Sequence, residues 1–298
     1  HESDDTTTND NNIKNKKKKP VSSSSFDHHH HHHHENDVAK ELVALVSHQF
    51  QSLADPHRAV TMKKYLKTDM PMYGVARPQR FEVEKKARAF LATHYTISTT
   101  STTTTKNHPE QDEETTTTTM IMSLESYLLI VETLWNLPMR EEKYLAIDLA
   151  IYYHPYYIST TTPSCKTAAL VLYESMLRQD YMWWDLVDPI ATHLIGKTAS
   201  KPILQHWIQD ENLWIRRSAL LAQLKFKHQT DEALLFQFCQ DCAHEKEFFI
   251  RKAIGWALRE YSKTSPEAVK KFLQQEKPNL SGLSYREGAK LLIQKGLL

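Results

Sequence analysis

Two residues near the middle of the chain have types and a spacing that suit stabilisation of a cation. Trp184 and Asp188 are four residues apart, so on a helix they share one face. A carboxylate beside an indole offers a cation both negative charge and a π face. The alternative is structural: Trp184 packs in the core, and Asp188 caps a helix whose first turn holds Pro189. Spacing alone leaves both interpretations open.

Another tryptophan, Trp256, stands in line with cations. Lys252, Trp256, Arg259 and Lys263 recur at intervals of four, three and four residues, off the apolar stripe of the same predicted helix. A helix meets a sugar–phosphate backbone in this way. The alternative is a partly covered tryptophan among basic side chains whose stems pack on protein while their heads reach water.

Two adjacent arginines, Arg216 and Arg217, stand near the start of a third predicted helix. A cation there is unfavourable for the helix dipole. The position makes sense if a phosphate or a carboxylate lies nearby. A solvated charged face is the alternative.

Several common catalytic signatures do not occur in this sequence. It has no GxxxxGK[ST], no GxGxxG after a strand, no HExxH and no GxSxG, which argues against NTPase, dinucleotide-enzyme, zinc-protease and α/β-hydrolase function. Cys239 and Cys242 form one isolated CxxC, which is half of a zinc site at most. The run His28–His34 is a possible metal-binding tract, an expression tag or a native homopolymer. We therefore expect no metal site and no cofactor.

The elements that must position these residues are helices almost throughout. Amphipathic segments of helical period follow one another with short links from about residue 40 onward. No alternating strand pattern bounded by turns occurs between them. An all-α fold of stacked helical hairpins is the prediction.

Composition divides the chain into parts. We expect a disordered low-complexity tail at residues 1–38 and a single domain at 39–298, which contains a disordered Thr-rich insertion at about 96–119. The net charge of +1 is unevenly placed: the tail carries −2 and residues 97–119 carry −3, so the remainder carries +6. That excess permits nucleic-acid binding without demonstrating it. No stretch approaches the roughly 20 apolar residues of a membrane span, so we expect no membrane partner.

Ordered motifs extend over residues 40–298 outside the Thr-rich insertion. In chain order they are 65–67, 70–75, 77–78, 134–138 with 140–141, 183–188, 214–217, 248–256 with 259–261, 283–284 and 286–287. Together these motifs resemble the DNA alkylation repair family of the AlkD type. In this chain the link between Asp188 and Arg217 is shorter than in that family.

The resemblance implies a HEAT-like repeat α-solenoid whose basic concave face cradles duplex DNA. It also implies a monofunctional DNA glycosylase that excises N3- and N7-alkylated purines. The family's catalytic positions correspond to Trp184, Asp188 and Trp256. The positions expected to contact DNA, or to flank the cleft, correspond to Tyr65, Arg217, Lys252 and Arg259.

The chemistry of such a substrate fits a single carboxylate. A purine alkylated at N3 or N7 is already a cation and departs neutral, so no acid need protonate it. What remains is to stabilise an oxocarbenium-like sugar and to place a water. Asp188 can serve both purposes, and the indoles of Trp184 and Trp256 can lie against the sugar. A glycoside with a poor leaving group would instead need a carboxylate pair.

Two other classes of function stay open. One is a non-catalytic HEAT-repeat protein that binds damaged or branched DNA, and the other is a helical-repeat scaffold for proteins. The expected partner is double-stranded DNA that contains alkylated purines, and the expected state is a monomer. The expected location is the nucleus in a eukaryote and the cytoplasm otherwise.

Overall fold

The computed structural model describes residues 25–97, 120–158 and 163–298. By packing, the chain divides into two units, His1–Asp37 and Val38–Leu298. Helix α1 (Ser25–Ser52) contains residues of both, so helix begins inside the segment expected to be a disordered tail. Once α1 is fixed by buried apolar side chains from Val38 onward, adding residues to its N-terminus needs no new nucleation. The core of the Thr-rich insertion, residues 98–119, lies outside the described residues, as do residues 159–162.

The described part of the chain is helical almost throughout. After α1 the helices are α2 (Pro56–Leu66), α3 (Arg77–His94), α4 (Leu124–Trp135), α5 (Arg140–Ile158), α6 (Pro163–Leu177), α7 (Trp184–Pro189), the π-helix η1 (Ile190–Ile195), α8 (Gly196–Thr198), α9 (Lys201–Trp207), α10 (Leu213–Leu221), the 3₁₀ turn η2 (Lys227–Gln229), α11 (Glu232–Asp241), α12 (Phe248–Tyr261), α13 (Pro266–Glu276) and α14 (Gly282–Gln294). Among these described helices, none combines the length and the apolar character that crossing a bilayer requires.

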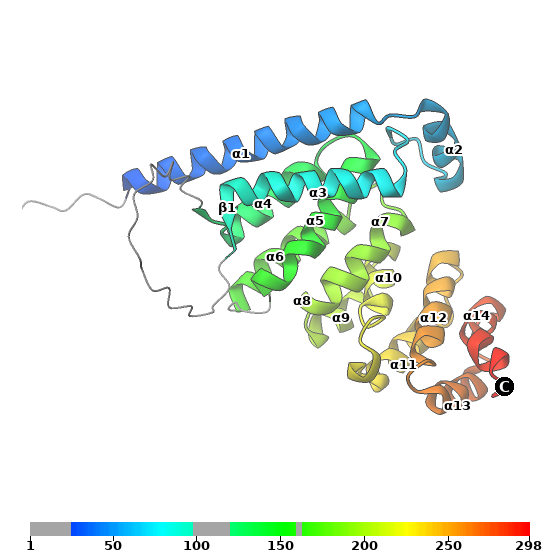
Figure 1. Cartoon of the computed structure of the whole chain (residues 1–298). Coiled ribbons are helices and arrows are strands. Elements are labelled where there is room, and N and C mark those ends of the chain that lie inside the picture. The colour runs from blue at the N-terminus through cyan, green and yellow to red at the C-terminus, as the bar shows by residue number, and fades with distance from the viewer. Residues whose placement is uncertain (1–24, 98–119, 159–162) are drawn as a thin grey trace, which may run out of the picture. The chain divides into compact units, whose positions relative to one another are not determined.

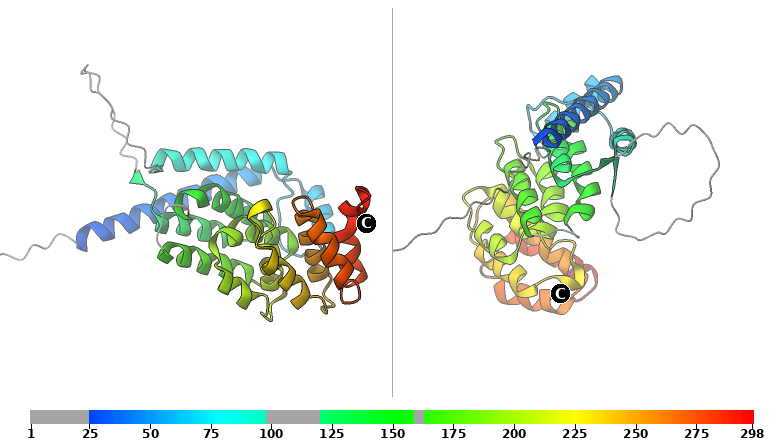
Figure 2. Two further views of the ribbon diagram at one scale, coloured as in Figure 1. Left: turned by 90° about the horizontal axis from the view of Figure 1, so that it is seen from below. Right: turned by 90° about the vertical axis from the view of Figure 1, so that its left-hand side faces the viewer.

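Within Val38–Leu298 the helices stack in chain order (Figure 1). One series consists of α5, α7, α10, α12 and α14, each in contact with the next. A second set packs against this series: α4 on α5, α6 on η1, α9 and α11 on α10, and α13 on α14. The two views of Figure 2 show the same succession from the green helices to the red C-terminal pair. The predicted all-α solenoid of stacked helix pairs is confirmed.

A short β-pair was not expected from the sequence. β1 (Tyr95–Thr96) and β2 (Met120–Ile121) run parallel, with Tyr95 opposite Met120 and Thr96 opposite Ile121. The pair joins the chain just before residue 98 to the chain just after residue 119. Two residues per strand are too few to give a detectable alternation of apolar and polar residues.

The apolar stripes of successive helices meet in one core. It extends from Leu42 on α1 through Leu134, Leu186 and Ile254 to Leu292 on α14, and each of these side chains is buried. Burying one such side chain contributes roughly 1.5–3 kcal/mol. This core fixes the register of one helix against the next, and with it the polar side chains that the same helices carry.

The start of α5 is anchored to the loop before α3. The buried carboxylate of Glu141 accepts the backbone N–H groups of residues 73–75 at 2.7–3.0 Å. An acidic side chain is favourable in the first turn of a helix. Gly74 has φ +82, and a Cβ there would lie 2.1 Å from the carbonyl oxygen of Asp55, so only glycine fits this turn.

The helix that carries Trp184 changes its geometry after Asp188. Pro189 ends α7 and lacks an N–H, so the regular i to i−4 ladder breaks. The π-helix Ile190–Ile195 follows, and the Thr192 hydroxyl donates to the carbonyl oxygen of Asp188 at 2.8 Å. Such π-turns occur frequently at functional sites.

The close approach of α12 to α14 predicts the effect of one substitution. A Cβ at Gly255 would lie 2.4 Å from the Cβ of Glu287 and 3.1 Å from the carbonyl oxygen of Ser284. Gly255→Ala should therefore separate the helices and cost about 1–3 kcal/mol of unfolding free energy. The measurement is urea unfolding followed by circular dichroism.

Gly282→Ala is the matched control. A Cβ at Gly282 meets only the mobile end of Arg286, at 3.1 Å, so this variant should be as stable as the wild type. Equal stability of the two alanine variants would contradict the packing described for α12 and α14.

Candidate active site

A cleft of about 690 Å³ brings together side chains from four helices. The residues that line it are Arg77, Arg80, Phe81 and Glu84 on α3, Tyr144, Ile147 and Asp148 on α5, Trp184, Asp185, Asp188 and Pro189 on α7, and Trp256 on α12. The three residues predicted to be catalytic, Trp184, Asp188 and Trp256, all line this one cleft, although 72 residues separate the first from the last.

Trp184 and Asp188 reach the cleft from the same face of α7, as their spacing predicts. The helix begins at Trp184 with Trp183 as its N-cap residue. Asp188 therefore lies one turn inside the helix, and the alternative in which it caps a helix beginning at Pro189 is wrong. Trp184 and Trp256 are each half-buried against the core, which leaves part of each indole open to the cleft.

Asp188 is held by a bidentate ion pair with Arg217 on α10. The Nε of Arg217 donates to Oδ1 at 2.8 Å, and Nη2 donates to Oδ2 at 2.9 Å. The remaining nitrogen, Nη1, donates to the carbonyl oxygen of Phe249 at the start of α12. One guanidinium thus fixes the carboxylate and joins α7, α10 and α12.

Two features of the environment of Asp188 act in opposite directions: burial favours the neutral carboxyl, and Arg217 favours the ionised one. Burial raises the pKa of Asp188 above its ordinary value, and the hydrogen bonds and charge of Arg217 oppose this rise. The Asp188 side chain is 13% exposed and that of Arg217 is 5% exposed. Because a guanidinium stays protonated in proteins, the pair presents an oriented carboxylate in the lining of the cleft.

Arg217 was predicted to contact DNA, and the structure gives it a different position. It is buried, and its donors are used by Asp188 and by Phe249. It orients Asp188 and does not face solvent. Its neighbour Arg216 pairs with Glu245 at 2.7 and 2.8 Å, so both arginines meet the carboxylates that their position near a helix start suggests.

A second carboxylate of the cleft, Asp185, is held just as firmly. Arg140 donates from Nη2 to Oδ1 at 2.5 Å and from Nε to Oδ2 at 3.0 Å, and the Tyr144 hydroxyl donates to Oδ2 as well. The Arg140 side chain is fully buried. This network ties α5 to α7 and uses both oxygens of Asp185.

A third carboxylate, Asp148, has no such partner. Within the residues that the structure describes, no hydrogen bond or ion pair holds it. Burial raises the pKa of Asp148 to about 6, the charge of Glu84 raises it further, and Arg80 and Arg77 lower it. Its side chain is one helical turn beyond Tyr144 on α5 and lines the cleft.

Sequence reasoning did not single out Asp148, Arg80 or Tyr144. A signal was present: Arg140, Tyr144 and Asp148 recur every four residues, and this places three polar groups on one face of the helix. The Arg80 guanidinium lies 4.1 Å from the centroid of the Tyr144 ring, which is a cation–π geometry.

The aromatic residues around Arg217 form a separate cluster. The rings of Trp183 and Trp214 lie 4.9 and 5.1 Å from that of Phe249, centroid to centroid. These contacts join the N-terminal ends of α7, α10 and α12, and the Arg217 guanidinium lies 5.9 Å from the centroid of the Phe249 ring.

The residues predicted to bind DNA lie outside the cleft lining. Tyr65 on α2 is 72% exposed. On α12, the Lys252 Nζ lies 3.1 Å from Glu287 Oε1, and Arg259 Nη1 lies 2.7 Å from Glu287 Oε2. Both cations therefore pair with one carboxylate of α14. The sequence pattern gave no sign that Glu287 would compete with a DNA phosphate for them.

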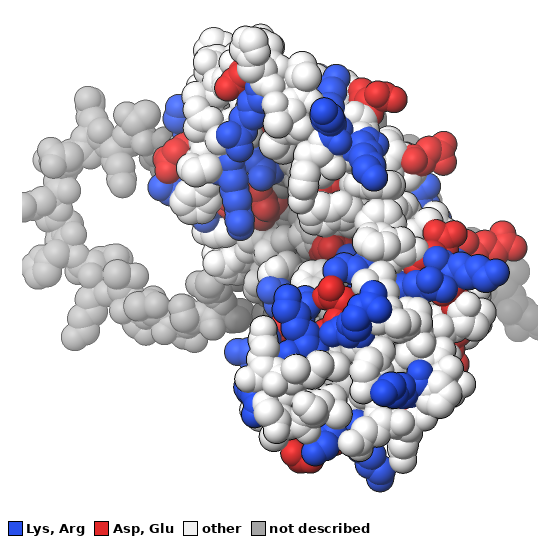
Figure 3. All heavy atoms as spheres, turned by 90° about the vertical axis from the view of Figure 1, so that its right-hand side faces the viewer, with Lys and Arg blue, Asp and Glu red and all other residues white. Residues whose placement is uncertain are grey.

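Charges of both signs occupy this region. Figure 3 shows Lys and Arg side chains above and below a hollow, and acidic side chains within the hollow. The cleft itself is lined by the carboxylates of Glu84, Asp148, Asp185 and Asp188 against the two arginines of α3. The cleft lining therefore holds four carboxylates and two arginines, where the sequence predicted a basic face.

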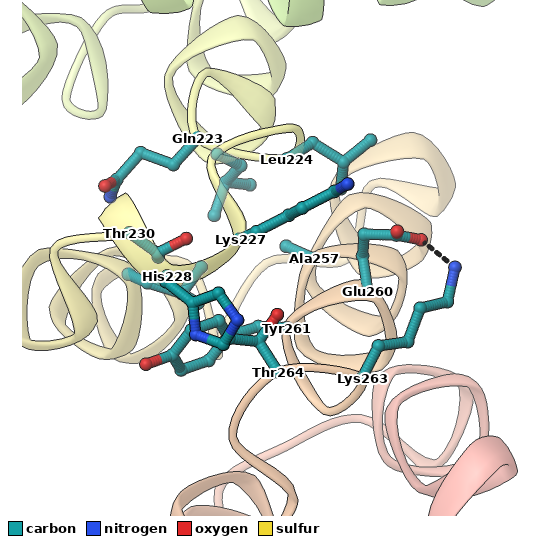
Figure 4. Close-up of a pocket in the computed structure, with 12 residues that line it drawn as sticks. Gln223, Leu224, Lys227, His228, Thr230, Ala257, Glu260, Tyr261, Lys263 and Thr264 are labelled. Carbon is teal, nitrogen blue, oxygen red and sulfur yellow. Dashed lines mark hydrogen bonds and ion pairs between the residues drawn. The ribbon is translucent and has the colours of Figure 1, made fainter.

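A separate cavity of about 280 Å³ lies further along α12, between η2 and the C-terminal end of α12 (Figure 4). Lys263, the last cation of the α12 series, lines this cavity and pairs with Glu260 at 2.7 Å. It therefore belongs to a different surface from Trp256. Among the described residues, no three His, Cys, Asp or Glu side chains are grouped to hold a metal ion.

Comparisons with known proteins agree with this architecture. A sequence model of a family described as "DNA alkylation repair enzyme" matches residues 46–116 and 109–292. A solved structure described as "Predicted DNA alkylation repair enzyme from Enterococcus faecalis" matches with a TM-score of 0.61 and 28% identity, over 80% of this chain and 97% of that chain. A comparison with curated proteins finds no match. The chain belongs to the DNA alkylation repair enzyme family.

Proposed function

We propose that the protein is a monofunctional DNA glycosylase that hydrolyses the N-glycosidic bond of N3- and N7-alkylated purines in duplex DNA. One observation carries the proposal: a carboxylate oriented by a bidentate arginine lies in the same cleft as two half-buried tryptophans. Family membership supports a role in DNA repair.

The arrangement suits the charge changes of this reaction. As the bond from C1′ to the base breaks, its electron pair moves to the base, which departs neutral, and positive charge develops on the sugar. A carboxylate fixed in advance stabilises that charge without reorganising. The faces of Trp184 and Trp256 add cation–π attraction. Water adds to C1′ as the base departs and loses a proton, which leaves a hemiacetal.

Substrate selection follows from the same chemistry. The groups that line the cleft are carboxylates, arginines and aromatic rings, and they complement a cationic sugar better than the edge of a particular base. Discrimination then arises from how readily the base departs. A cationic 7-methylguanine is a better leaving group than a neutral hypoxanthine, and it should be released faster.

Replacing Asp188 with asparagine tests the proposal. The wild type should release 7-methylguanine and 3-methyladenine from alkylated duplex DNA, and Asp188→Asn should be slower by about 10²-fold or more. DNA affinity should be retained, because the substituted group faces the sugar. Asp241→Asn, on α11 outside the cleft and able to keep its bond to Gln237, is the matched control and should act as the wild type.

If the wild type releases no base while its DNA affinity is intact, the glycosylase proposal is wrong and a non-catalytic DNA-binding protein takes its place. If the wild type shows no salt-dependent affinity for DNA, the result would instead support a protein scaffold.

The Arg217–Asp188 pair predicts a linked effect on stability and pH dependence. Arg217→Gln leaves a buried carboxylate without its cation, so it should cost about 3–5 kcal/mol of unfolding free energy. The pKa of Asp188 should rise further, because the opposing effect of Arg217 is lost. Since the ionised form is the active one, base release should now decline at a higher pH as the solution is acidified.

Arg178→Gln is the control for this prediction. Arg178 forms a more exposed ion pair with Asp210, and its loss should cost only about 0–1 kcal/mol. Denaturant unfolding and the pH–rate profile measure the two effects. An Arg217→Gln protein with wild-type stability and an unmoved pH profile would refute the role given to the pair.

The shared carboxylate on α14 predicts an unusual effect on DNA binding. Glu287 occupies Lys252 and Arg259, so a DNA phosphate must compete with it. Glu287→Gln should therefore strengthen binding, whereas Lys252→Ala should weaken it and reduce the slope of log affinity against log salt by about 1.

The measurement is fluorescence anisotropy of a labelled duplex over a range of salt concentrations. Weaker binding by Glu287→Gln, or an unchanged salt slope in Lys252→Ala, would show that these cations do not meet phosphate.

A further inference from the structure

Three aspartates of the cleft differ in what holds them. Asp188 accepts from Arg217 through both oxygens, and Asp185 accepts from Arg140 and Tyr144 through both oxygens. Asp148 lines the same cleft with neither oxygen engaged by a donor among the described residues. Its carboxylate is therefore the one of these three whose oxygens are available to a bound water.

The hydrolysis needs a group that takes a proton. A carboxylate in a bidentate pair with arginine has both oxygens engaged, so accepting a proton from water would break a charge-assisted pair. Asp188 is thus well suited to face a developing cation and poorly suited to accept a proton from water. Glu84, the fourth carboxylate of the lining, lies 3.4 Å from Arg88 on its own helix.

We propose that Asp148 is the general base of the reaction, holding and deprotonating the water that adds to C1′ of the sugar. The inference rests on the proposed glycosylase function. In the step, a water oxygen forms a bond to C1′, and the Asp148 carboxylate takes the released proton. The electron pair of the C1′–N bond leaves with the base. The proton then passes from Asp148 to solvent.

The surroundings of Asp148 suit this task. The charged and titratable groups that share the cleft with it are Arg77, Arg80 and Glu84 on α3, Tyr144 on its own helix, and Asp185 and Asp188 on α7. Burial, and then Glu84, raise the pKa of Asp148 to about 6 against the opposing arginines. The carboxylate is therefore ionised at neutral pH and strongly basic for an aspartate, and it loses this capacity as the pH falls below about 6.

The experiment measures single-turnover release of 7-methylguanine from alkylated duplex DNA by the wild type and by Asp148→Asn. At neutral pH, Asp148→Asn should be slower by about 10²-fold or more, as for loss of a general base. Its DNA affinity and melting temperature should stay at wild-type values. As the pH is lowered the two rates should converge, because the wild-type base is then protonated.

Sodium azide distinguishes a base from a structural residue. Azide is a nucleophile that carries no proton to remove, so it should restore release in Asp148→Asn and form a glycosyl azide. It should not restore release in Asp188→Asn, where the stabilising charge is absent. Glu84→Gln is a second test: it should move the acidic decline of the rate to lower pH, because it removes a charge that raises the pKa of Asp148.

The outcomes separate this inference from the proposed function. If the wild type and Asp148→Asn release base equally fast at neutral pH, Asp148 is not the base, and the glycosylase proposal stands. A slow Asp148→Asn that azide does not rescue also overturns the inference. If the wild type itself releases no base, the proposed function fails, and this inference fails with it.

Discussion

The ion pair between Asp188 and Arg217 is the contact on which the site depends. Burial raises the pKa of a carboxylate, and without a partner its orientation is not fixed. Arg217 opposes the rise in the pKa of Asp188 and orients the carboxylate, and its third nitrogen donates to the Phe249 carbonyl. Three helices from different parts of the chain therefore position one functional group.

The solenoid supplies what such a pair requires. Each helix of the inner series packs on the next through the continuous core, so α7 and α10 present their polar side chains at a fixed spacing. The Arg140–Asp185 and Glu141–Gly74 contacts repeat this principle one helix earlier. Buried ion pairs and hydrogen-bonded carboxylates in this fold join one helix to the next.

How much of this arrangement follows from the sequence depends on the range of the interaction. Helical period predicts the stacked helices, and the four-residue spacing of Trp184 and Asp188 correctly predicts their common face, because both are local properties. Arg217 is buried because it pairs with Asp188, 29 positions away, and Lys252 pairs with Glu287, 35 positions away. No local sequence pattern encodes either ion pair. Asp148 escaped notice for a related reason. A single aspartate in a helix is ordinary until the fold shows that Asp185 and Asp188 beside it in the cleft are engaged by arginines and it is not.

The central claim is that Asp188 stabilises positive charge on the sugar, and binding of a transition-state mimic tests it most directly. Two duplexes would be compared, one with a cationic pyrrolidine abasic analogue and one with a neutral tetrahydrofuran analogue. The wild type should bind the cationic duplex more tightly by about 10²-fold or more, and Asp188→Asn should bind both alike. A wild type without this preference, or an Asp188→Asn protein that keeps it, would contradict the account.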